Sequence, residues 1–266
     1  MDQSIEYAKK HFAEHGFSSH STVYVATNED LRNALKCMPK DTKRALTVAA
    51  SGDHPMFIKL YGAKHIDTFD ISFNAQLIMD IKTKALSLLN YEEYCNLLKY
   101  LYVSKYITHI PNMPQIIKTL TPFEQEYIKE MRGKCLFNKE IKFESISLPT
   151  ESEFQKMRQI INNPFNFIWS DIQTLHEKLV GTYDFIHLSN ILDYVGTYQN
   201  CTDIIDSLIP YTVPGSNICI TCFNKDAEAI CEKFVWLQKL HHDKEQEWTA
   251  NNVQMMNNTY VMHRIR

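Results

Sequence analysis

The sequence predicts an α/β protein in which helices cover both faces of a mostly parallel sheet. Short, apolar, β-rich runs alternate along the chain with segments whose apolar residues recur at helical spacing, a pattern typical of strand–helix–strand units. The chain has 266 residues, of which 44% are hydrophobic, which is enough to bury one large core. We therefore expect a single domain over residues 1–266, with a helical insertion or cap at about 91–150.

The expected elements follow one another in a regular order. The run RALTVAA, from Arg44 to Ala50, is the first strong buried-strand pattern. The expected strands cover residues 22–26, 44–50, 65–71, 165–169, 183–188, 217–223 and 259–265. The expected helices cover residues 4–15, 31–37, 54–61, 74–89, 151–162, 173–180, 201–208 and 226–247. Thr27 or Asn28 is expected to cap the second of these helices, because its side-chain oxygen can accept a hydrogen bond from a free N–H group.

The overall charge and the cysteine content narrow the function classes. A net charge of −3 predicts no strongly basic face, so nucleic acid is not a favoured partner. The N-terminus has no basic start followed by an apolar stretch, and no apolar run approaches the length of a membrane span. We expect a cytoplasmic protein without stable membrane insertion. The seven cysteines are scattered, and Cys219 and Cys222 lack a second pair at zinc spacing, so reduced core cysteines and no metal site are expected.

Polar residues follow three of the predicted strands, at the carboxyl ends where ligands bind on parallel sheets. Ser51, Gly52 and Asp53 follow the strand LTVAA, and a glycine after a small residue lets the backbone approach a ligand closely. Asp70 ends the next strand, eighteen residues after Gly52, where a carboxylate can accept hydrogen bonds from ribose hydroxyls. Asp171 follows FNFIW and could accept from an adenine amino group. Singly, these residues are explained by a turn and by helix caps; together and in order they predict a nucleoside site.

The lack of a glycine fingerprint distinguishes between nucleoside ligands. The sequence contains no G-x-G-x-x-G, the motif that cradles the pyrophosphate of NAD. S-adenosylmethionine has no pyrophosphate and therefore fits better. The expected fold is Rossmann-like, of the class I methyltransferase type, with N-terminal helices and with S-adenosylmethionine as co-substrate.

The fourth strand end, after YDFIHL, carries residues that would face the reactive end of such a ligand. Ser189, Asn190, Asp193 and Tyr194 follow this strand. Asn190 and Asp193 are the candidate catalytic residues, Ser189 and Asn190 are expected to contact S-adenosylmethionine, and Tyr194 is a candidate substrate contact. Helix capping by Ser189 or Asn190 and a surface position for Asp193 are the alternatives. His54, near another strand end, is a further candidate substrate contact, and a hydrogen-bonded structural histidine is its alternative.

Three blocks of the sequence resemble a known enzyme family. The block LTVAASGDHPMFIKLYGAKHIDTFDIS, followed by a long helix and LNYEEY, is similar to the 3-amino-3-carboxypropyl transferases of the betaine-lipid synthase type. The block YDFIHLSNILDY resembles their fourth-strand motif, and VYVATNEDL resembles a TNEN-like segment of bacterial relatives. Residues 98–151 match nothing in that family.

The resemblance implies a reaction and a role for individual residues. Enzymes of this family bind S-adenosylmethionine and transfer its 3-amino-3-carboxypropyl arm instead of its methyl group, releasing methylthioadenosine without a metal. The resemblance assigns the methionine and ribose side to Ala50, Ser51, Gly52 and Asp53, the ribose hydroxyls to Asp70 with Ile71, the adenine to Asp171 and Ile172, the border of the reacting arm to Ser189, Asn190 and Asp193, and closure over that arm to Thr27 and Asn28.

The resemblance also suggests an acceptor. Betaine-lipid enzymes act on diacylglycerol at a membrane, and this sequence shows no basic amphipathic helix for that purpose. Its size and motif content resemble the small aminocarboxypropyl transferases of microcin C maturation, which implies antibiotic biosynthesis with the phosphate of a peptidyl-adenylate as acceptor. Two alternatives stay open: a methyltransferase acting on a small molecule, and a non-catalytic module that binds a nucleoside.

Overall fold

The computed structural model describes residues 23–104, 107–130, 137–138, 148–162, 165–222, 229–230, 234, 237–250 and 253–264. The chain divides into two compact units that are interleaved in the sequence. The first unit comprises residues 1–29, 49–60 and 70–169, and the second unit comprises residues 30–48, 61–69 and 170–266. The single-domain organisation expected from the sequence stays a prediction.

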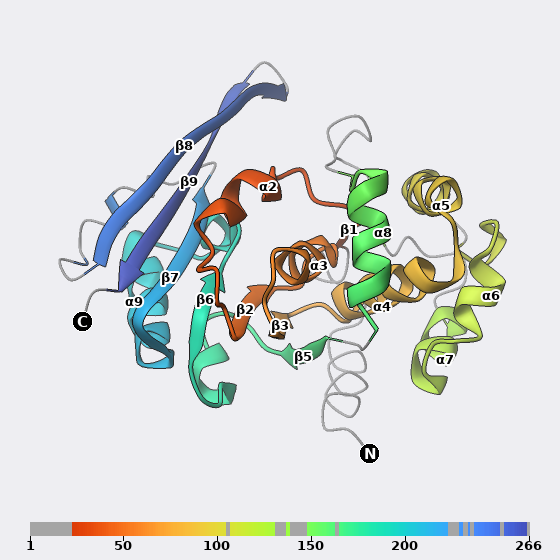
Figure 1. Cartoon of the computed structure of the whole chain (residues 1–266), viewed down its shortest axis with the longest axis horizontal. Helices are drawn as coiled ribbons and strands as arrows, with labels where there is room; N and C mark the ends of the chain where they lie inside the picture. The colour runs from red at the N-terminus through yellow and green to blue at the C-terminus, as the bar shows by residue number, and fades with distance from the viewer. Residues whose placement is uncertain are drawn as a thin grey trace. The chain divides into compact units, whose positions relative to one another are not determined.

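The second unit is built on a sheet of six described strands. In the order in which they pair, these are β3 (His65–Asp70), β2 (Arg44–Val48), β6 (Tyr183–His187), β7 (Thr212–Cys222), β9 (Val253–Arg264) and β8 (Leu237–Ala250). β2 is parallel to both β3 and β6, and β6 is parallel to β7. β9 runs antiparallel to β7 and to β8, and Figure 1 shows these three strands side by side. The last residue of β3, Asp70, belongs to the first unit.

β2 lies where the strand order of this sheet reverses. The chain passes from β2 to β3 on one side, and β6 pairs later on the other side. Ala45 of β2 is opposite Ile66 of β3 and Phe185 of β6, and all three side chains are buried. Ligands on open α/β sheets bind beyond the carboxyl ends of the strands at such a point. The residues that follow β2, β3 and β6 are therefore the first places to look for a site.

The second unit also contains two described helices and four 3-10 turns. They are α2 (Leu31–Ala34), α9 (Tyr198–Leu208) and the 3-10 turns η1 (Leu35–Cys37), η4 (Leu175–Lys178), η5 (Ile191–Tyr194) and η6 (Ile209–Tyr211). α9 begins where Thr197 and Asn200 cap each other, since each side-chain oxygen accepts the other residue's backbone N–H. The helix then buries Cys201, Ile205 and Leu208.

The first unit is mainly helical. It contains α3 (Asp53–Leu60), α4 (Phe73–Leu88), α5 (Tyr91–Val103), α6 (Met113–Ile117), α7 (Pro122–Glu130), α8 (Glu151–Ile160) and the 3-10 turn η2 (Ile107–His109). Its described strands are β5 (Asn166–Trp169) and the parallel pair β1 (Val23–Tyr24) and β4 (Phe137–Asn138). α5, α6 and α7 lie in the segment where a helical insertion was expected. Ser72 caps α4 through the backbone N–H of Asn74, which fixes the start of that helix directly after β3.

The predicted fold class is confirmed: the protein is an α/β, Rossmann-like structure with a mostly parallel sheet. The helix expected over residues 226–247 is wrong for residues 237–247, which belong to β8 and pair with β9. Such a ladder supplies backbone partners and outweighs weak local helix propensity. The N-cap of α2 is Asp30, whose side chain accepts from Arg32 N–H, and not Thr27 or Asn28. The N-terminal helix expected over residues 4–15 lies outside the described residues.

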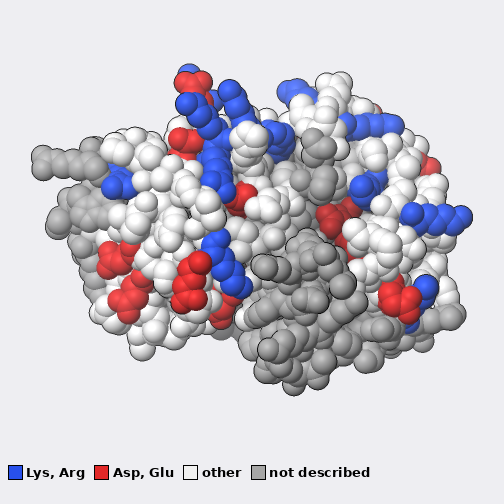
Figure 2. Space-filling view, turned by 90° about the horizontal axis from the view of Figure 1, so that it is seen from below, with Lys and Arg blue, Asp and Glu red and all other residues white. Residues whose placement is uncertain are grey.

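The described surface mixes charges of both signs. On the face drawn in Figure 2, Lys and Arg side chains are interspersed with Asp and Glu, as expected for a chain with 28 basic and 31 acidic residues. Within the part of the chain that the structure describes, every helix is too short or too polar to cross a membrane.

Candidate functional site

The turn that follows β2 holds its backbone in left-handed conformations. Ala50 has a φ of 45° and Gly52 a φ of 81°, and the N–H of Gly52 donates to the carbonyl of Ala49 at 2.7 Å. A residue with a side chain adopts this conformation at a cost of roughly 1–3 kcal/mol, and such strain concentrates at binding and catalytic sites. Gly52 is also close-packed, because a Cβ there would lie 2.8 Å from the Cα of Met79 in α4.

Asp70, which ends β3, is bonded to this turn. Its Oδ2 accepts the N–H of Ala50 at 3.0 Å and its Oδ1 accepts the N–H of Ser72 at 2.9 Å. Desolvation of the half-buried carboxyl group raises the pKa of Asp70 to about 6, although hydrogen bonds from the backbone N–H groups of Ser72, Ala50 and Ile71 favour the ionised form. At neutral pH the group is therefore mainly a carboxylate, and it retains capacity for a further donor.

Aromatic side chains fix the chain just after β3. The indole N–H of Trp169 donates to the carbonyl of Ile71 at 2.8 Å, and its ring stacks on Phe73 with centroids 5.7 Å apart. Phe73 also contacts the rings of Phe123 and Tyr127 in α7 edge-on, at 5.0 and 4.7 Å. The backbone of Ile71, a predicted cofactor contact, is thereby held in place.

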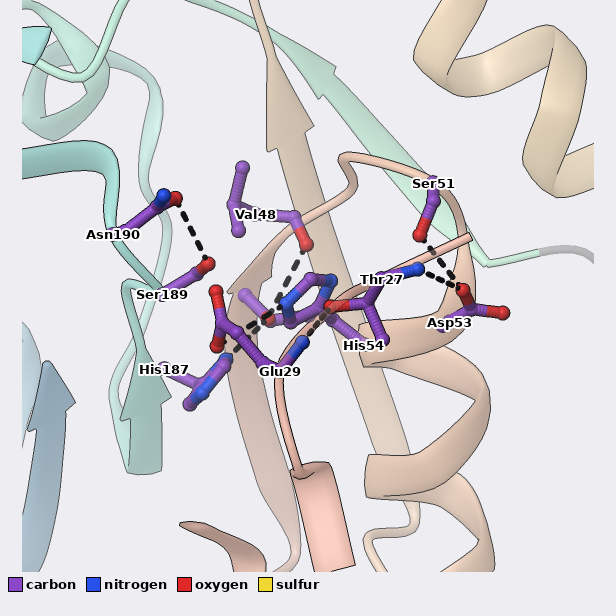
Figure 3. A network of polar contacts seen from close by, with 10 residues as sticks. Thr27, Glu29, Val48, Ser51, Asp53, His54, His187, Ser189 and Asn190 are labelled. Carbon is purple, nitrogen blue, oxygen red and sulfur yellow. Dashed lines mark hydrogen bonds and ion pairs between the residues drawn. The ribbon is translucent and has the colours of Figure 1, made fainter. Parts of the chain in front are cut away.

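Asp53 begins α3 and is buried, with both carboxylate oxygens bonded to the protein. Oδ2 accepts the N–H of Thr27 at 2.7 Å and the hydroxyl of Ser51 at 2.8 Å, and Oδ1 accepts from the ammonium of Lys82 at 2.6 Å. Figure 3 shows Thr27 and Ser51 pointing toward this carboxylate. The structure thus brings together two predicted cofactor residues, Ser51 and Asp53, and one predicted substrate residue, Thr27.

A second acidic side chain lies beside the first turn of α3. Glu29 and His54 are both buried, and Glu29 Oε2 lies 3.7 Å from His54 Nε2. Figure 3 shows the two side chains beside each other. The N–H of Glu29 donates to the hydroxyl oxygen of Thr27 at 3.1 Å. Residues 27–29 therefore contact α3 through Asp53 and through His54, and the half-buried Asn28 lies between these contacts. No group of three or more His, Cys, Asp or Glu side chains among the described residues is arranged to hold a metal ion.

In the second unit, the residues after β6 form another strained turn. Ser189 has a φ of 53° and is buried, and its carbonyl accepts the N–H of Thr221 at 2.8 Å. Its hydroxyl lies 3.4 Å from Asn190 Oδ1, as Figure 3 shows. The side chain of Asn190 makes no capping bond to η5, so the capping role considered for Asn190 does not apply.

The other predicted residues of the second unit differ in accessibility. Asp171 is half-buried, and its Oδ1 accepts the N–H of Gln173 at 2.8 Å, which is a local turn bond. Ile172 is buried and Asp193 is half-buried. Tyr194 is 70% exposed, so its ring is open to solvent.

Two buried charged residues, Lys82 and Glu29, were not expected from the sequence. Lys82 lies on α4 four residues after Ile78 and three before Ala85, both of which are buried. A lysine at an apolar position of a helix was the available signal, because lysines are almost never fully buried without a partner. Glu29 gave no comparable signal, since an acidic residue in a connecting segment is usually solvated.

Comparison with known proteins finds likeness only at the level of the fold. No family model and no curated protein matches the sequence. The N-methyltransferase NodS from Bradyrhizobium japonicum WM9, solved with S-adenosyl-l-homocysteine, is 10% identical, with 99% of this chain and 98% of that chain covered and a TM-score of 0.45. TehB from Haemophilus influenzae is 11% identical, with 97% of this chain and 66% of that chain covered and a TM-score of 0.48. Likenesses this distant establish no shared activity, and the fold class rests on the strand order of the second unit.

Proposed function

We propose that this protein is an S-adenosylmethionine-dependent transferase. The observation that carries the proposal is the bond between two strand ends, in which Asp70 accepts the N–H of Ala50 in a left-handed turn. The turn after β2 lets the backbone approach a ligand, and an acidic residue at the end of β3 can bind ribose hydroxyls. Because the chain has no G-x-G-x-x-G for a pyrophosphate, S-adenosylmethionine is favoured over a dinucleotide.

Asp70 is the central binding residue in this proposal. Its two oxygens hold backbone N–H groups of Ala50, Ser72 and Ile71 and retain capacity for a ribose hydroxyl. The turn from Ala50 to Gly52 would lie against the methionine end of the ligand. Buried Asp53 would act on the ligand through this turn, since its own carboxylate is occupied by three protein donors. For the second unit we propose, from the motif resemblance alone, that Asp171 and Ile172 contact adenine and that Ser189, Asn190 and Asp193 border the reacting arm.

For the transferred group we propose 3-amino-3-carboxypropyl, on the strength of the motif resemblance. A nucleophile of the acceptor attacks Cγ of the arm, the Cγ–S bond breaks, and its electron pair returns to sulfur in neutral methylthioadenosine. An anionic phosphate oxygen, as in a peptidyl-adenylate, needs no general base. The protein then contributes alignment and exclusion of water. The strained turn at Ser189 supports a binding role beside Asn190.

The test is binding followed by product analysis. Titration calorimetry with S-adenosylmethionine is expected to show binding that Asp70→Asn weakens, and no binding by the wild type would refute the transferase proposal. Incubation with acceptors that carry a phosphate, analysed by mass spectrometry, is expected to release methylthioadenosine. Release of S-adenosylhomocysteine instead would replace arm transfer by methyl transfer. Tight binding without turnover on any acceptor would favour a nucleoside-binding module.

A further inference from the structure

Lys82, which forms a buried ion pair with Asp53, has no role in the ligand contacts proposed above. Lys82 is 0% exposed on α4, and its ammonium lies 2.6 Å from Asp53 Oδ1. Burial lowers the pKa of Lys82, and the charge of Asp53 opposes that shift. Taking two charges out of water is costly, so a buried ion pair is weak evidence for a stabilising role. The pair calls for another explanation.

The geometry around Asp53 offers one. Its carboxylate collects the ammonium of Lys82 on α4, the backbone N–H of Thr27 and the hydroxyl of Ser51 in the turn after β2. All of these lie in the first unit. Without Lys82 the carboxylate would be an uncompensated buried charge. Lys82 compensates that charge, and hydrogen bonds to a charged acceptor are shorter and stronger than neutral ones.

Residues 27–29 are linked to this carboxylate by a chain of contacts. The N–H of Thr27 donates to Asp53, and the hydroxyl oxygen of Thr27 in turn accepts the N–H of Glu29. The carboxylate of Glu29 then lies beside His54, the next residue of α3. Ser51, bonded to the same carboxylate oxygen, is flanked by Ala50 and Gly52, the two left-handed residues of the turn.

We propose that Lys82 is a positioning residue: through Asp53 it fixes residues 27–29 and Ser51 in the one arrangement that binds S-adenosylmethionine. This inference rests on the proposed function and adds to it a residue that does not touch the ligand.

The test removes the pair as a unit. Asp53→Leu combined with Lys82→Met takes away both charges and leaves apolar side chains, a replacement that is often tolerated for buried pairs. The matched control is Arg44→Met combined with Asp67→Leu, which removes an ion pair of the second unit with Arg44 Nε 3.0 Å from Asp67 Oδ2. Amide hydrogen exchange of residues 23–29 in the free protein reports on the segment, and titration calorimetry with S-adenosylmethionine reports on binding.

We expect the Thr27 amide to exchange roughly 10- to 100-fold faster in the Asp53–Lys82 double variant, as loss of a charged acceptor implies. The affinity for S-adenosylmethionine is expected to fall about tenfold or more, while the Arg44–Asp67 control keeps wild-type exchange and affinity at these positions. A folded double variant with unchanged Thr27 exchange, or with unchanged affinity, overturns the proposal. Absence of binding by the wild type is a separate result, which refutes the proposed function before any variant is measured.

A conservative variant covers the case in which the double variant does not fold. Asp53→Asn keeps an acceptor oxygen but not the charge, so Thr27 exchange between the wild-type and double-variant values is expected, together with weakened binding. Wild-type exchange and affinity in this variant would overturn the proposal in the same way.

Discussion

Replacing Gly52 by alanine tests whether the turn after β2 is packed as closely as the structure shows. The φ of Gly52 is 81°, and placing a Cβ in the left-handed region costs roughly 1–2 kcal/mol. The new Cβ would also lie 2.8 Å from the Cα of Met79, a backbone atom that cannot swing aside, and overpacking of this kind costs about 1–3 kcal/mol. We expect Gly52→Ala to lower the free energy of unfolding by roughly 2–5 kcal/mol in total.

Gly215→Ala is the matched control, because Gly215 has a φ of 94° and no atom within 4 Å of its added Cβ. It carries the conformational cost alone. Urea unfolding followed by circular dichroism measures both variants, and the melting temperature should fall by roughly 2–4 °C per kcal/mol. If Gly52→Ala is no more destabilised than Gly215→Ala, the close approach to Met79 has no energetic weight, and the account of the turn is refuted.

Three further predictions concern titratable side chains. Because the pKa of Asp70 is about 6, affinity for S-adenosylmethionine measured by calorimetry should fall by up to about tenfold per pH unit below that value, and Asp70→Asn should remove this dependence; pH-independent wild-type binding would exclude Asp70 as the ribose ligand. Desolvation and the neighbouring carboxyl of Glu124 raise the pKa of Asp80 from 3.8 to about 8. Between these two pH values the folded state binds more protons than the unfolded state. The free energy of unfolding should therefore fall as pH rises through this range, by up to about 1.4 kcal/mol per pH unit. Glu124→Gln should flatten that slope in urea titrations, and an equally steep slope in the variant would contradict the contribution of Glu124 to the raised pKa of Asp80. Tyr183→Phe removes the hydroxyl that donates to buried Asp67 at 2.8 Å and should cost about 1–3 kcal/mol of unfolding free energy without changing ligand affinity; a cost near zero would mean that the bond has no net value.

Strands with strong local patterns were predictable from the sequence. β2 and β6 are short apolar runs ended by polar residues, and such runs between helical segments indicate buried parallel strands. The same reasoning selected Asp70 and the Ala50–Gly52 turn as candidate ligand contacts, because ligand-facing residues of these sheets follow the strands directly. The hydrogen bond from Ala50 to Asp70 could not be predicted, because it joins positions twenty residues apart.

The missed features share a physical cause, since each depends on a partner that is distant in the sequence. Lys82 is buried because Asp53, 29 residues earlier, neutralises it, and Glu29 is buried beside His54. The strand β8 depends on its ladder with β9, and strand propensity is set largely by such neighbours. Local periodicity carries no record of these pairings.

The position of β2 in its sheet has a consequence for synthesis of the protein on the ribosome. Ala45 can pair with Ile66 soon after both are made, but its partner on the other side, Phe185, is made 140 residues after Ala45. Until β6 is made, one edge of the apolar strand β2 has no neighbouring strand, and unpaired edges of this kind pair with other chains and aggregate. Truncated chains that stop before β6 should therefore aggregate, and the yield of intact protein should respond to chaperones that shield nascent chains.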